Sequence, residues 1–399
     1  MRSRRQHGRT AARQRYPGCR QSSSLPFYRS AVLPLLLAAC GPPDRAADTQ
    51  ELPDSGYAMQ RVAGGALVLP DGFRIDVYAE RIDGIRFLAL GPDGAVYATR
   101  SGHGTVIRLP DRNRDGRADE VVQVAQGLRN PSGITFHGDV LYVAEEHQVI
   151  RFRPPYAQHD VLVHGLPADG GHSTRTVRVR GDHLYVSIGS SCNLCDERDP
   201  RRAAIVRYDL DGLGETIYAS GLRNSVGLVV HPETGDLWAT NNDRDRLGDD
   251  RPPDRINLIR EHGWYGWPQC YLPGTPNPEY RRDAHLCDNA IGPVVTLPAH
   301  SAPLGIAFYT GTRFPDSMRG DAFVALHGSW DRSFPIGYEV VRVPVRDGRP
   351  TGAWRHFIAG WQVGRRWWGR PVDVLVLPDG SMLLSDDFGG RVYRVWYEG

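Results

Sequence analysis

The sequence predicts an all-β protein built as a six-bladed β-propeller. Three observations support this fold class. Strand–turn–strand units recur along the chain, no long amphipathic helical pattern follows Phe73, and Gly and Pro are abundant at 45 and 30 residues. Short hairpins need Gly beside Asp or Pro, because these residues adopt the backbone angles of tight turns. A period of about 40–50 residues with roughly four strands per unit is typical of propeller blades.

Six hairpins mark the inner strands of the blades. Each joins two short apolar strands through a turn that holds Gly beside Asp or Pro. They lie at 88–97, 134–142, 177–185, 228–238, 306–323 and 374–383, of which the fifth is the weakest. Tyr97, Tyr142 and Tyr185 occupy matching positions and are 45 and 43 residues apart.

The strand Phe73–Tyr78 has no blade of its own. We expect it to pair with residues 391–395 and to close the ring, because closure removes free strand edges. The propeller is predicted to span residues 67–399, with an insertion at about 241–298.

The first 39 residues have the pattern of a targeting segment, with eight arginines, no acidic residue and an apolar run at 31–39. That run is too short to cross a bilayer, which takes about 20 apolar residues. Leu37-Ala38-Ala39-Cys40 resembles a bacterial lipobox, whose cysteine is acylated; the alternative is an ordinary signal peptide with a chance cysteine. We expect a flexible tether at 40–66 and a protein anchored by lipid on the periplasmic side of a bacterial membrane, the outer membrane being favoured.

Charge and cysteine content narrow the function classes. Beyond residue 39 the chain holds 40 basic and 46 acidic residues, a net charge of about −6, which argues against a nucleic-acid partner. In an oxidising compartment we expect two disulfides by proximity, Cys192–Cys195 and Cys270–Cys287. Asp196 after the CxxC excludes a c-type haem site, and a zinc or redox role for the pair is the weaker alternative.

The loops that join an outer strand to the next inner strand open onto one end of a propeller axis, so residues far apart in sequence converge there. These loops carry Arg129-Asn130, Gly171-His172, Arg223-Asn224, His300-Ser301 and residues 365–370. Arginine pairs with anionic ligands, and a neutral histidine can act as general base. The alternative is structural: Gly-Leu-Arg-Asn occurs at both 127–130 and 221–224, and these side chains could bind loop backbone.

Six motifs carry a resemblance that covers about residues 69–395. They are Gly-His-Ser-Thr-Arg-Thr at 171–176, Ser-Ser-Cys-Asn-Leu-Cys at 190–195, Gly-Leu-Arg-Asn at 221–224, Gly-Trp-Tyr-Gly-Trp-Pro at 263–268, His-Gly-Ser-Trp at 327–330 and Gly-Arg-Pro-Val-Asp at 369–373. Together they resemble the glucose/sorbosone dehydrogenase family, most of all its sorbosone-type branch. The resemblance implies a six-bladed propeller that binds pyrroloquinoline quinone (PQQ) with Ca²⁺ and oxidises a sugar, passing electrons to a separate cytochrome or to the quinone pool.

The resemblance also implies roles for individual residues. His172 matches the histidine that takes the substrate proton while hydride passes to the quinone. Arg223, Asn224 and Arg370 match residues that hold the cofactor, and we expect Asn130 and His327 to join them. The cofactor-linked Ca²⁺ would take backbone carbonyls, for which residues 241–243 are candidates.

Three positions depart from the soluble glucose dehydrogenases. An acid is expected where Gly171 stands, a lysine near His327 and a second arginine near Val372. The loss of two cations weakens the predicted hold on a tricarboxylate quinone.

A second calcium signal lies at residues 111–119. Oxygen-bearing side chains alternate there, with Gly at the sixth position, as in a loop that wraps a hard cation. The predicted ligands are Asp111, Asn113, Asp115 and Asp119. No helices flank the loop and the twelfth position is Val122, so it is not an EF-hand; a solvated turn is the alternative. Any ion here would be structural.

Three functions therefore compete. The first is the PQQ-dependent sugar dehydrogenase. The second is a non-catalytic propeller that binds a carbohydrate or a protein partner, which the departures favour. The third is a calcium-dependent propeller hydrolase of lactones or esters, which the basic character of the axial loops disfavours.

Overall fold

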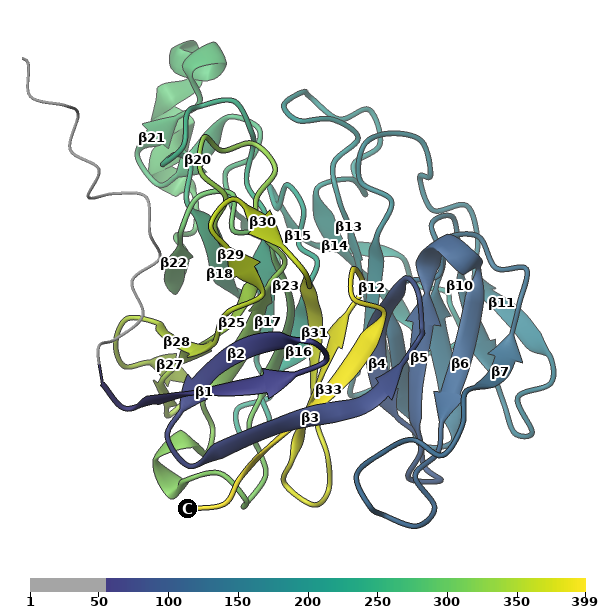
Figure 1. The fold of residues 1–399 in the computed structure, drawn as a ribbon. Helices are drawn as coiled ribbons and strands as arrows, with labels where there is room; N and C mark the ends of the chain where they lie inside the picture. The colour runs from purple at the N-terminus through teal and green to yellow at the C-terminus, as the bar shows by residue number, and fades with distance from the viewer. Residues whose placement is uncertain (1–54) are drawn as a thin grey trace, which may run out of the picture. The chain divides into compact units, whose positions relative to one another are not determined.

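The computed structural model describes residues 55–399 and confirms the six-bladed propeller (Figure 1). Each blade contains four antiparallel strands, and in blades 1 to 5 these strands follow the chain outwards from the axis. Blade 3 carries a short fifth strand, β19 (Gly263–Trp264), parallel to its outermost strand. The first three blades are formed as follows. Blade 1 holds β4 (Ile85–Leu90), β5 (Val96–Arg100), β6 (Thr105–Leu109) and β7 (Val122–Ala125); blade 2 holds β8 (Ile134–His137), β9 (Val140–Ala144), β10 (Val149–Phe152) and β11 (His159–Val163); blade 3 holds β12 (Arg175–Arg180), β13 (His183–Ile188), β14 (Ala204–Asp209) and β15 (Thr216–Ser220).

Blades 4 and 5 follow the same order, whereas blade 6 takes its outermost strand from residues 73–80. Blade 4 holds β16 (Leu228–Val230), β17 (Leu237–Asn241), β18 (Asp254–Ile259) and β22 (Val295–Leu297); blade 5 holds β23 (Pro303–Phe308), β24 (Ala322–Leu326), β25 (Glu339–Val343) and β28 (Arg355–Ile358); blade 6 holds β31 (Pro371–Val376), β32 (Met382–Asp386), β33 (Arg391–Tyr397) and β3 (Phe73–Glu80). The closing strand is confirmed, because β3 pairs antiparallel with β33 from Phe73↔Tyr397 to Glu80↔Arg391.

Short elements lie in the connections. The set contains β19, which pairs with the outer strand of blade 3, three two-stranded units and three 3₁₀ segments. They are β19 (Gly263–Trp264), β20 (Cys270–Leu272), β21 (Thr275–Pro276), β26 (Val345–Arg346), β27 (Arg349–Pro350), β29 (Gln362–Val363), β30 (Arg366–Trp367), η1 (Ser101–His103), η2 (Pro278–Asn289) and η3 (Asp316–Met318). Within residues 55–399 no helix is long and apolar enough to cross a membrane.

Two expected boundaries change. The stretch 241–298 includes β18 and β22, so the segment added to blade 4 is 260–294; it contains the predicted Cys270–Cys287 disulfide, which is confirmed together with Cys192–Cys195. The tether prediction is wrong for residues 57–66, which belong to a hairpin of β1 (Tyr57–Val62) and β2 (Gly65–Pro70). This hairpin forms because Val62, Leu67 and Leu69 bury their side chains in the core. The leader, the lipobox and residues 40–54 lie outside the described residues.

Hydroxyl groups lock neighbouring blades together near the axis. In four blades a Thr or Ser of the second strand donates to a carbonyl on the next blade. The pairs are Thr99 to Ser132 (2.8 Å), Ser187 to Ser225, Thr240 to Leu304 (2.9 Å) and Ser385 to Arg86 (2.6 Å). The inner strands enclose an axial channel of about 290 Å³. The blades therefore form one closed ring that holds the loops at its ends in fixed positions.

Candidate functional site

Two sets of loops open at the same end of the ring, because the strands of each blade alternate in direction. One set joins an outer strand to the next inner strand and carries His172, Arg223, His300 and Arg370, as predicted. The other set joins the second and third strands of a blade; the repeats alone do not reveal it, although the resemblance named His327 and residues 241–243 within it. It contributes Ser190 from blade 3, residues 242–253 from blade 4, His327 from blade 5 and Asp387 from blade 6.

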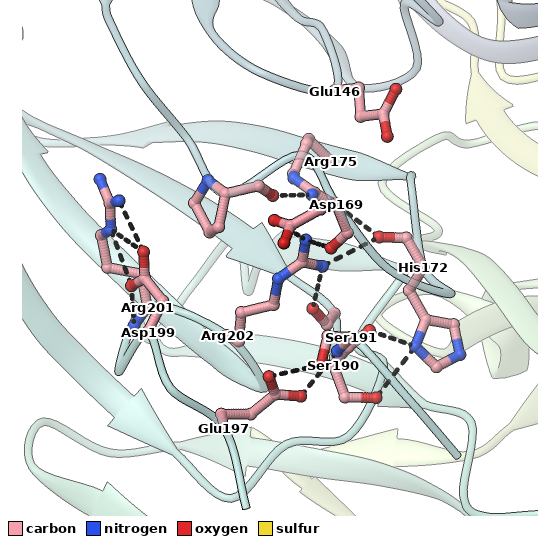
Figure 2. Close-up of polar contacts among 12 residues, drawn as sticks. Glu146, Asp169, His172, Arg175, Ser190, Ser191, Glu197, Asp199, Arg201 and Arg202 are labelled. Atoms are coloured by element: carbon pink, nitrogen blue, oxygen red, sulfur yellow. Dashed lines mark hydrogen bonds and ion pairs between the residues drawn. The ribbon is translucent and has the colours of Figure 1, made fainter. Parts of the chain in front are cut away.

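The His172 ring is held by the loop that follows β13. Its Nδ1 lies 2.8 Å from the Ser190 carbonyl oxygen and 3.0 Å from Ser190 Oγ (Figure 2). The Ser190 hydroxyl donates to the Cys192 carbonyl at 2.7 Å, so its oxygen accepts from the ring. Because a carbonyl oxygen only accepts, Nδ1 carries the proton of the neutral ring. Nε2 is then unprotonated, and among the described residues it has no hydrogen-bond partner.

The electrostatic surroundings keep this histidine neutral. Burial and the neighbouring Arg223 cation lower the pKa of His172 to about 4, and the hydrogen bond to the Ser190 carbonyl offsets only part of this. At neutral pH the ring is therefore a base with a free Nε2 lone pair.

Arg223 is nearly buried at 4% exposure, and the surrounding loops accept all five of its N–H groups. Its Nε donates to the Asn193 carbonyl (3.0 Å), and Nη1 donates to the carbonyls of Asn242 (3.2 Å) and Asp243 (2.6 Å). Its Nη2 donates to Asn193 Oδ1 (2.9 Å) and Asp245 Oδ2 (3.3 Å). Arg223 thus ties two loops together and acts on His172 through its charge.

Asn224 lies directly beside His172, as the packing around Gly189 at the end of β13 demonstrates. A Cβ placed on Gly189 would come within 2.6 Å of Asn224 Oδ1 and 2.7 Å of the His172 Cβ. Glycine at this position therefore lets the two side chains converge over one strand end. The predicted pairing of His172 with the Arg223-Asn224 loop is present in the structure.

A second polar group surrounds His327. Its Nε2 lies 2.9 Å from Asp387 Oδ1, and Arg86 Nη1 lies 2.6 Å from Asp387 Oδ2. Burial lowers the pKa of His327 to about 4. Burial also opposes ionisation of Asp387, but the hydrogen bond from His327 and the Arg86 cation outweigh it and hold the pKa of this carboxyl well below its usual range. The contact is therefore a hydrogen bond from a neutral histidine to a carboxylate.

Arg370 is fixed against this group. Its Nε donates to the His327 carbonyl and its Nη2 to the Gly328 carbonyl, both at 3.0 Å, and its guanidinium lies 5.7 Å from the centre of the Tyr338 ring. Among the described residues Nη1 has no hydrogen-bond partner. Nη1 is therefore free to donate to the carboxylate of an anion, and the predicted cofactor contact of Arg370 stays a prediction.

A continuous chain of contacts joins the two groups along the rim. The Ser190 amide donates to the Arg223 carbonyl at 2.7 Å. Asp245 then lies 3.7 Å from His300 Nδ1, while Arg223 holds its other carboxylate oxygen. The loop that begins at His300 continues to Ala302, whose carbonyl accepts from the His327 amide at 3.0 Å. His172, Arg223 and Arg370 thus belong to one connected network across blades 3 to 6.

Oxygen atoms gather where β17 ends. Asn242 Oδ1 is buried without a hydrogen-bond partner, beside the Asn242 and Asp243 carbonyls that Arg223 contacts. Hard cations such as Ca²⁺ take oxygen ligands of this kind, so the residues predicted for the cofactor-linked ion fit it.

Two further groups could approach a metal. Single ligand atoms of Asp245, His300 and Asp331 lie within 4.8 Å of one another; a second such group contains Cys192 and Cys195, whose disulfide removes their thiolates.

Two predicted sites lie apart from this network. Asn130 adopts a left-handed backbone (φ 51°) in the loop between blades 1 and 2, where its neighbour Arg129 pairs with Glu146 at 3.3 Å. The loop 111–119 connects β6 to β7, and such connections open at the opposite end of the ring. Its oxygen atoms accept from its own amides: Asp111 from Gly116 (3.0 Å), Asn113 from Asp115 (3.1 Å) and Asp119 from Arg112 (2.9 Å). Cofactor binding at Asn130 and cation binding at residues 111–119 stay predictions.

Comparison with known proteins identifies the family of this chain. The profile of the TrAA12-like family matches residues 67–356. The chain belongs to the TrAA12-like family. An uncharacterized protein of Borreliella burgdorferi is 32% identical over 354 residues, which cover 83% of this chain and 91% of that protein. The pyrroloquinoline quinone-dependent pyranose dehydrogenase of Coprinopsis cinerea is 24% identical over 82% of this chain. This family member spans about half of the length of that enzyme, 54%.

Solved structures share the fold. The holo PQQ domain of the Coprinopsis cinerea pyranose dehydrogenase superposes with a TM-score of 0.71 at 22% identity, covering 87% of this TrAA12-like chain and 99% of that domain. The calcium structure of a Trichoderma reesei AA12 enzyme superposes with a TM-score of 0.74 at 21% identity, covering 85% and 98%. The architecture derived from the repeats is therefore that of the AA12 propellers.

Proposed function

We propose that this TrAA12-like protein is a PQQ-dependent dehydrogenase that oxidises an aldose or a related sugar. One observation carries the proposal: a half-buried, neutral His172 presents an unprotonated Nε2 beside Asn224 on the axial rim. A general base of this kind is what removal of a proton from a sugar hydroxyl requires. The names of two relatives agree with it: the Coprinopsis cinerea protein is a PQQ-dependent pyranose dehydrogenase, and a Hypocrea jecorina protein, 25% identical over 67% of this chain, is a PQQ-dependent sugar dehydrogenase.

In this proposal the chain orients the reactants, and PQQ, when bound, supplies the redox chemistry by accepting a hydride. His172 Nε2 accepts the proton of the sugar hydroxyl at the carbon being oxidised. Arg370 donates its free Nη1 to a carboxylate of the cofactor, and Asn224 offers its amide beside the base. The carbonyls of Asn242 and Asp243 would hold Ca²⁺.

A second candidate, a propeller that binds a carbohydrate without catalysis, is favoured by two features. All five donors of Arg223 are engaged within the protein, and His327 is neutral in a region where a lysine is expected. Both reduce the positive charge available to a tricarboxylate.

The experiment separates the two candidates. The purified chain is titrated with PQQ in the presence of Ca²⁺, and dye reduction is followed with a panel of aldoses. We expect a shifted quinone spectrum and sugar-dependent reduction. In His172→Ala we expect turnover to fall by roughly 10²–10⁴-fold while the quinone spectrum still shifts. Sugar binding without quinone binding or turnover would refute the dehydrogenase and favour the binding protein.

We also propose that Cys40 carries a lipid anchor on the periplasmic side and that electrons leave to a separate acceptor. The lipobox-like Leu37-Ala38-Ala39-Cys40 supports the anchor. Labelling cells with a radioactive fatty acid tests it: the label is expected on the native chain and absent from Cys40→Ala. A label that persists in the variant would contradict the anchor.

A further inference from the structure

Two arginines lie buried behind His172, and neither has a part in the proposed reaction. Arg175 is 0% exposed and Arg202 is 4% exposed. Burying a charge is unfavourable unless it is well hydrogen-bonded or paired. Among the described residues Arg175 has no carboxylate within ion-pair distance, and the one near Arg202, Asp169, lies 3.6 Å away with a fully exposed side chain. Their partners are instead backbone carbonyls.

The two guanidinium groups meet at one atom, the carbonyl oxygen of His172 (Figure 2). Arg175 Nη1 donates to this oxygen at 2.9 Å, and Arg202 Nη1 reaches it at 3.4 Å. Arg175 also donates to the carbonyls of Thr174 (2.9 Å) and Pro167 (2.5 Å). Arg202 also donates to the carbonyls of Gly189 (3.2 Å) and Asp169.

These contacts replace the sheet hydrogen bonds that the His172 loop lacks. Between β11 and β12 only the amides of Leu166 and Gly171 donate to backbone carbonyls within the described chain, to His147 (2.9 Å) and Ser191 (2.6 Å). The carbonyls of this loop are fixed mainly by the two arginines. Without them the loop would gain conformational freedom, and the histidine with it.

Arg202 in addition connects the His172 backbone to the strand whose end also holds the His172 ring. It binds the Gly189 carbonyl, and the next residue, Ser190, accepts the Nδ1 proton of the ring. Hydrogen bonds therefore fix both the backbone and the ring of His172 to the end of β13. A small shift of the loop relative to this strand would break the hydrogen bond that selects the tautomer.

We propose that Arg175 and Arg202 are positioning residues that hold the His172 backbone so that its Nδ1 stays on the Ser190 carbonyl and its Nε2 faces the substrate. The proposal rests on the dehydrogenase function, in which His172 is the base. In this proposal the arginines act through the geometry of their hydrogen bonds rather than through their charge. A lysine would keep the charge but lacks the planar fork that reaches two carbonyls at once.

The variants are Arg202→Lys and Arg175→Lys, with Arg201→Lys as the matched control. Arg201 is adjacent in sequence but turns away to Asp199 (2.7 Å) and Glu215 (3.4 Å), as Figure 2 shows for Asp199. With PQQ and Ca²⁺ bound, we expect kcat to fall on the order of 10–100-fold in each of the two variants, with KM and bound quinone within about twofold. The control should keep its kcat. Equal kcat losses in Arg201→Lys, or unchanged kcat in both variants, would overturn the proposal.

A second readout needs no turnover. Ring nitrogens of ¹⁵N-histidine-labelled protein, free of cofactor, report by NMR which nitrogen carries the proton, and His172→Gln identifies the signal. The native protein is expected to show a protonated Nδ1. Both variants are expected to show a mixture of tautomers while their folded fraction keeps the unfolding temperature of the native protein. If the native chain oxidises no sugar but the variants still lose the tautomer, the dehydrogenase function fails and the positioning role stands. An unchanged tautomer in both folded variants refutes the positioning role itself.

Discussion

The acid limb of the pH–rate profile gives a direct test of the environment of His172. Catalysis requires the neutral ring, and burial together with Arg223 lowers its pKa from the ordinary 6.5 to about 4. The sign follows: kcat/KM is retained as the pH falls from 8 towards 5 and is lost only as it passes through about 4. The shift corresponds to about 3 kcal/mol of preference for the neutral form.

The difference in the neutral fraction of the ring is close to its greatest near pH 5.5. An ordinary histidine is roughly nine-tenths protonated at this pH and would leave about a tenth of the activity. His172 should still be almost wholly neutral and leave nearly all of it. The difference is roughly tenfold, well above the scatter of a steady-state assay.

The assay measures initial rates of dye reduction from pH 3.5 to 8 at low sugar concentration, so that kcat/KM reports the free enzyme. Each sample is returned to pH 7 and measured again, which separates reversible protonation from acid unfolding. Arg223→Met serves as a comparison, because loss of the cation should move the limb to higher pH. A limb with its midpoint near 6.5 in the native protein would show that the ring is solvated, and would refute the reasoning.

Three further predictions concern the cofactor, the added segment and the second calcium site. Arg370→Met should weaken PQQ binding by roughly 10–100-fold in a spectral titration, since it removes a charged hydrogen bond; the exposed Arg365→Met serves as its control, and equal losses would contradict a direct contact. Loss of the Cys270–Cys287 bridge by double substitution to Ala should lower the free energy of unfolding by about 3 kcal/mol in denaturant, because the bridge closes a loop of 17 residues. Ca²⁺ should raise the unfolding temperature of the native chain more than that of Asp111→Ala, with equal turnover in both; an identical response would refute a cation at residues 111–119.

Much of the fold could be predicted because it repeats. Regular turns located the inner hairpins, and the unpaired strand at Phe73 indicated how the ring closes. The outer strand of blade 4, Val295–Leu297, escaped notice because it has three residues and follows a long excursion from β18. The β1–β2 hairpin escaped because it directly follows the Pro- and Asp-rich stretch 41–56, with which its first strand was grouped, although Val62 and Leu67 are buried.

The repeats predicted the candidate site only from one of its two loop sets, and the resemblance alone named His327 and residues 241–243 in the other. The outer-to-inner loops were visible through repeated Arg-Asn and His residues. The loops between second and third strands open at the same end, a signal that strand direction alone could have supplied, and they hold Ser190 and Asp387. Residue patterns do not reveal which main-chain atoms form hydrogen bonds in the site. The carbonyl of Ser190 selects the tautomer of His172, and any residue type could provide that carbonyl.

The hydrogen bond from His172 to the Ser190 carbonyl explains how a glycine can stand at position 171, where an acid is expected. A carboxylate beside a histidine both orients the ring and stabilises its protonated form, which raises the pKa. The Ser190 carbonyl orients the ring through the same Nδ1–H hydrogen bond but carries no net charge, so burial and Arg223 prevail. The orientation that an acid would supply is then left to the backbone, where Arg175 and Arg202 hold the loop. A base fixed by dipoles and cations stays neutral at lower pH than one fixed by an anion, and the pH profile distinguishes the two designs.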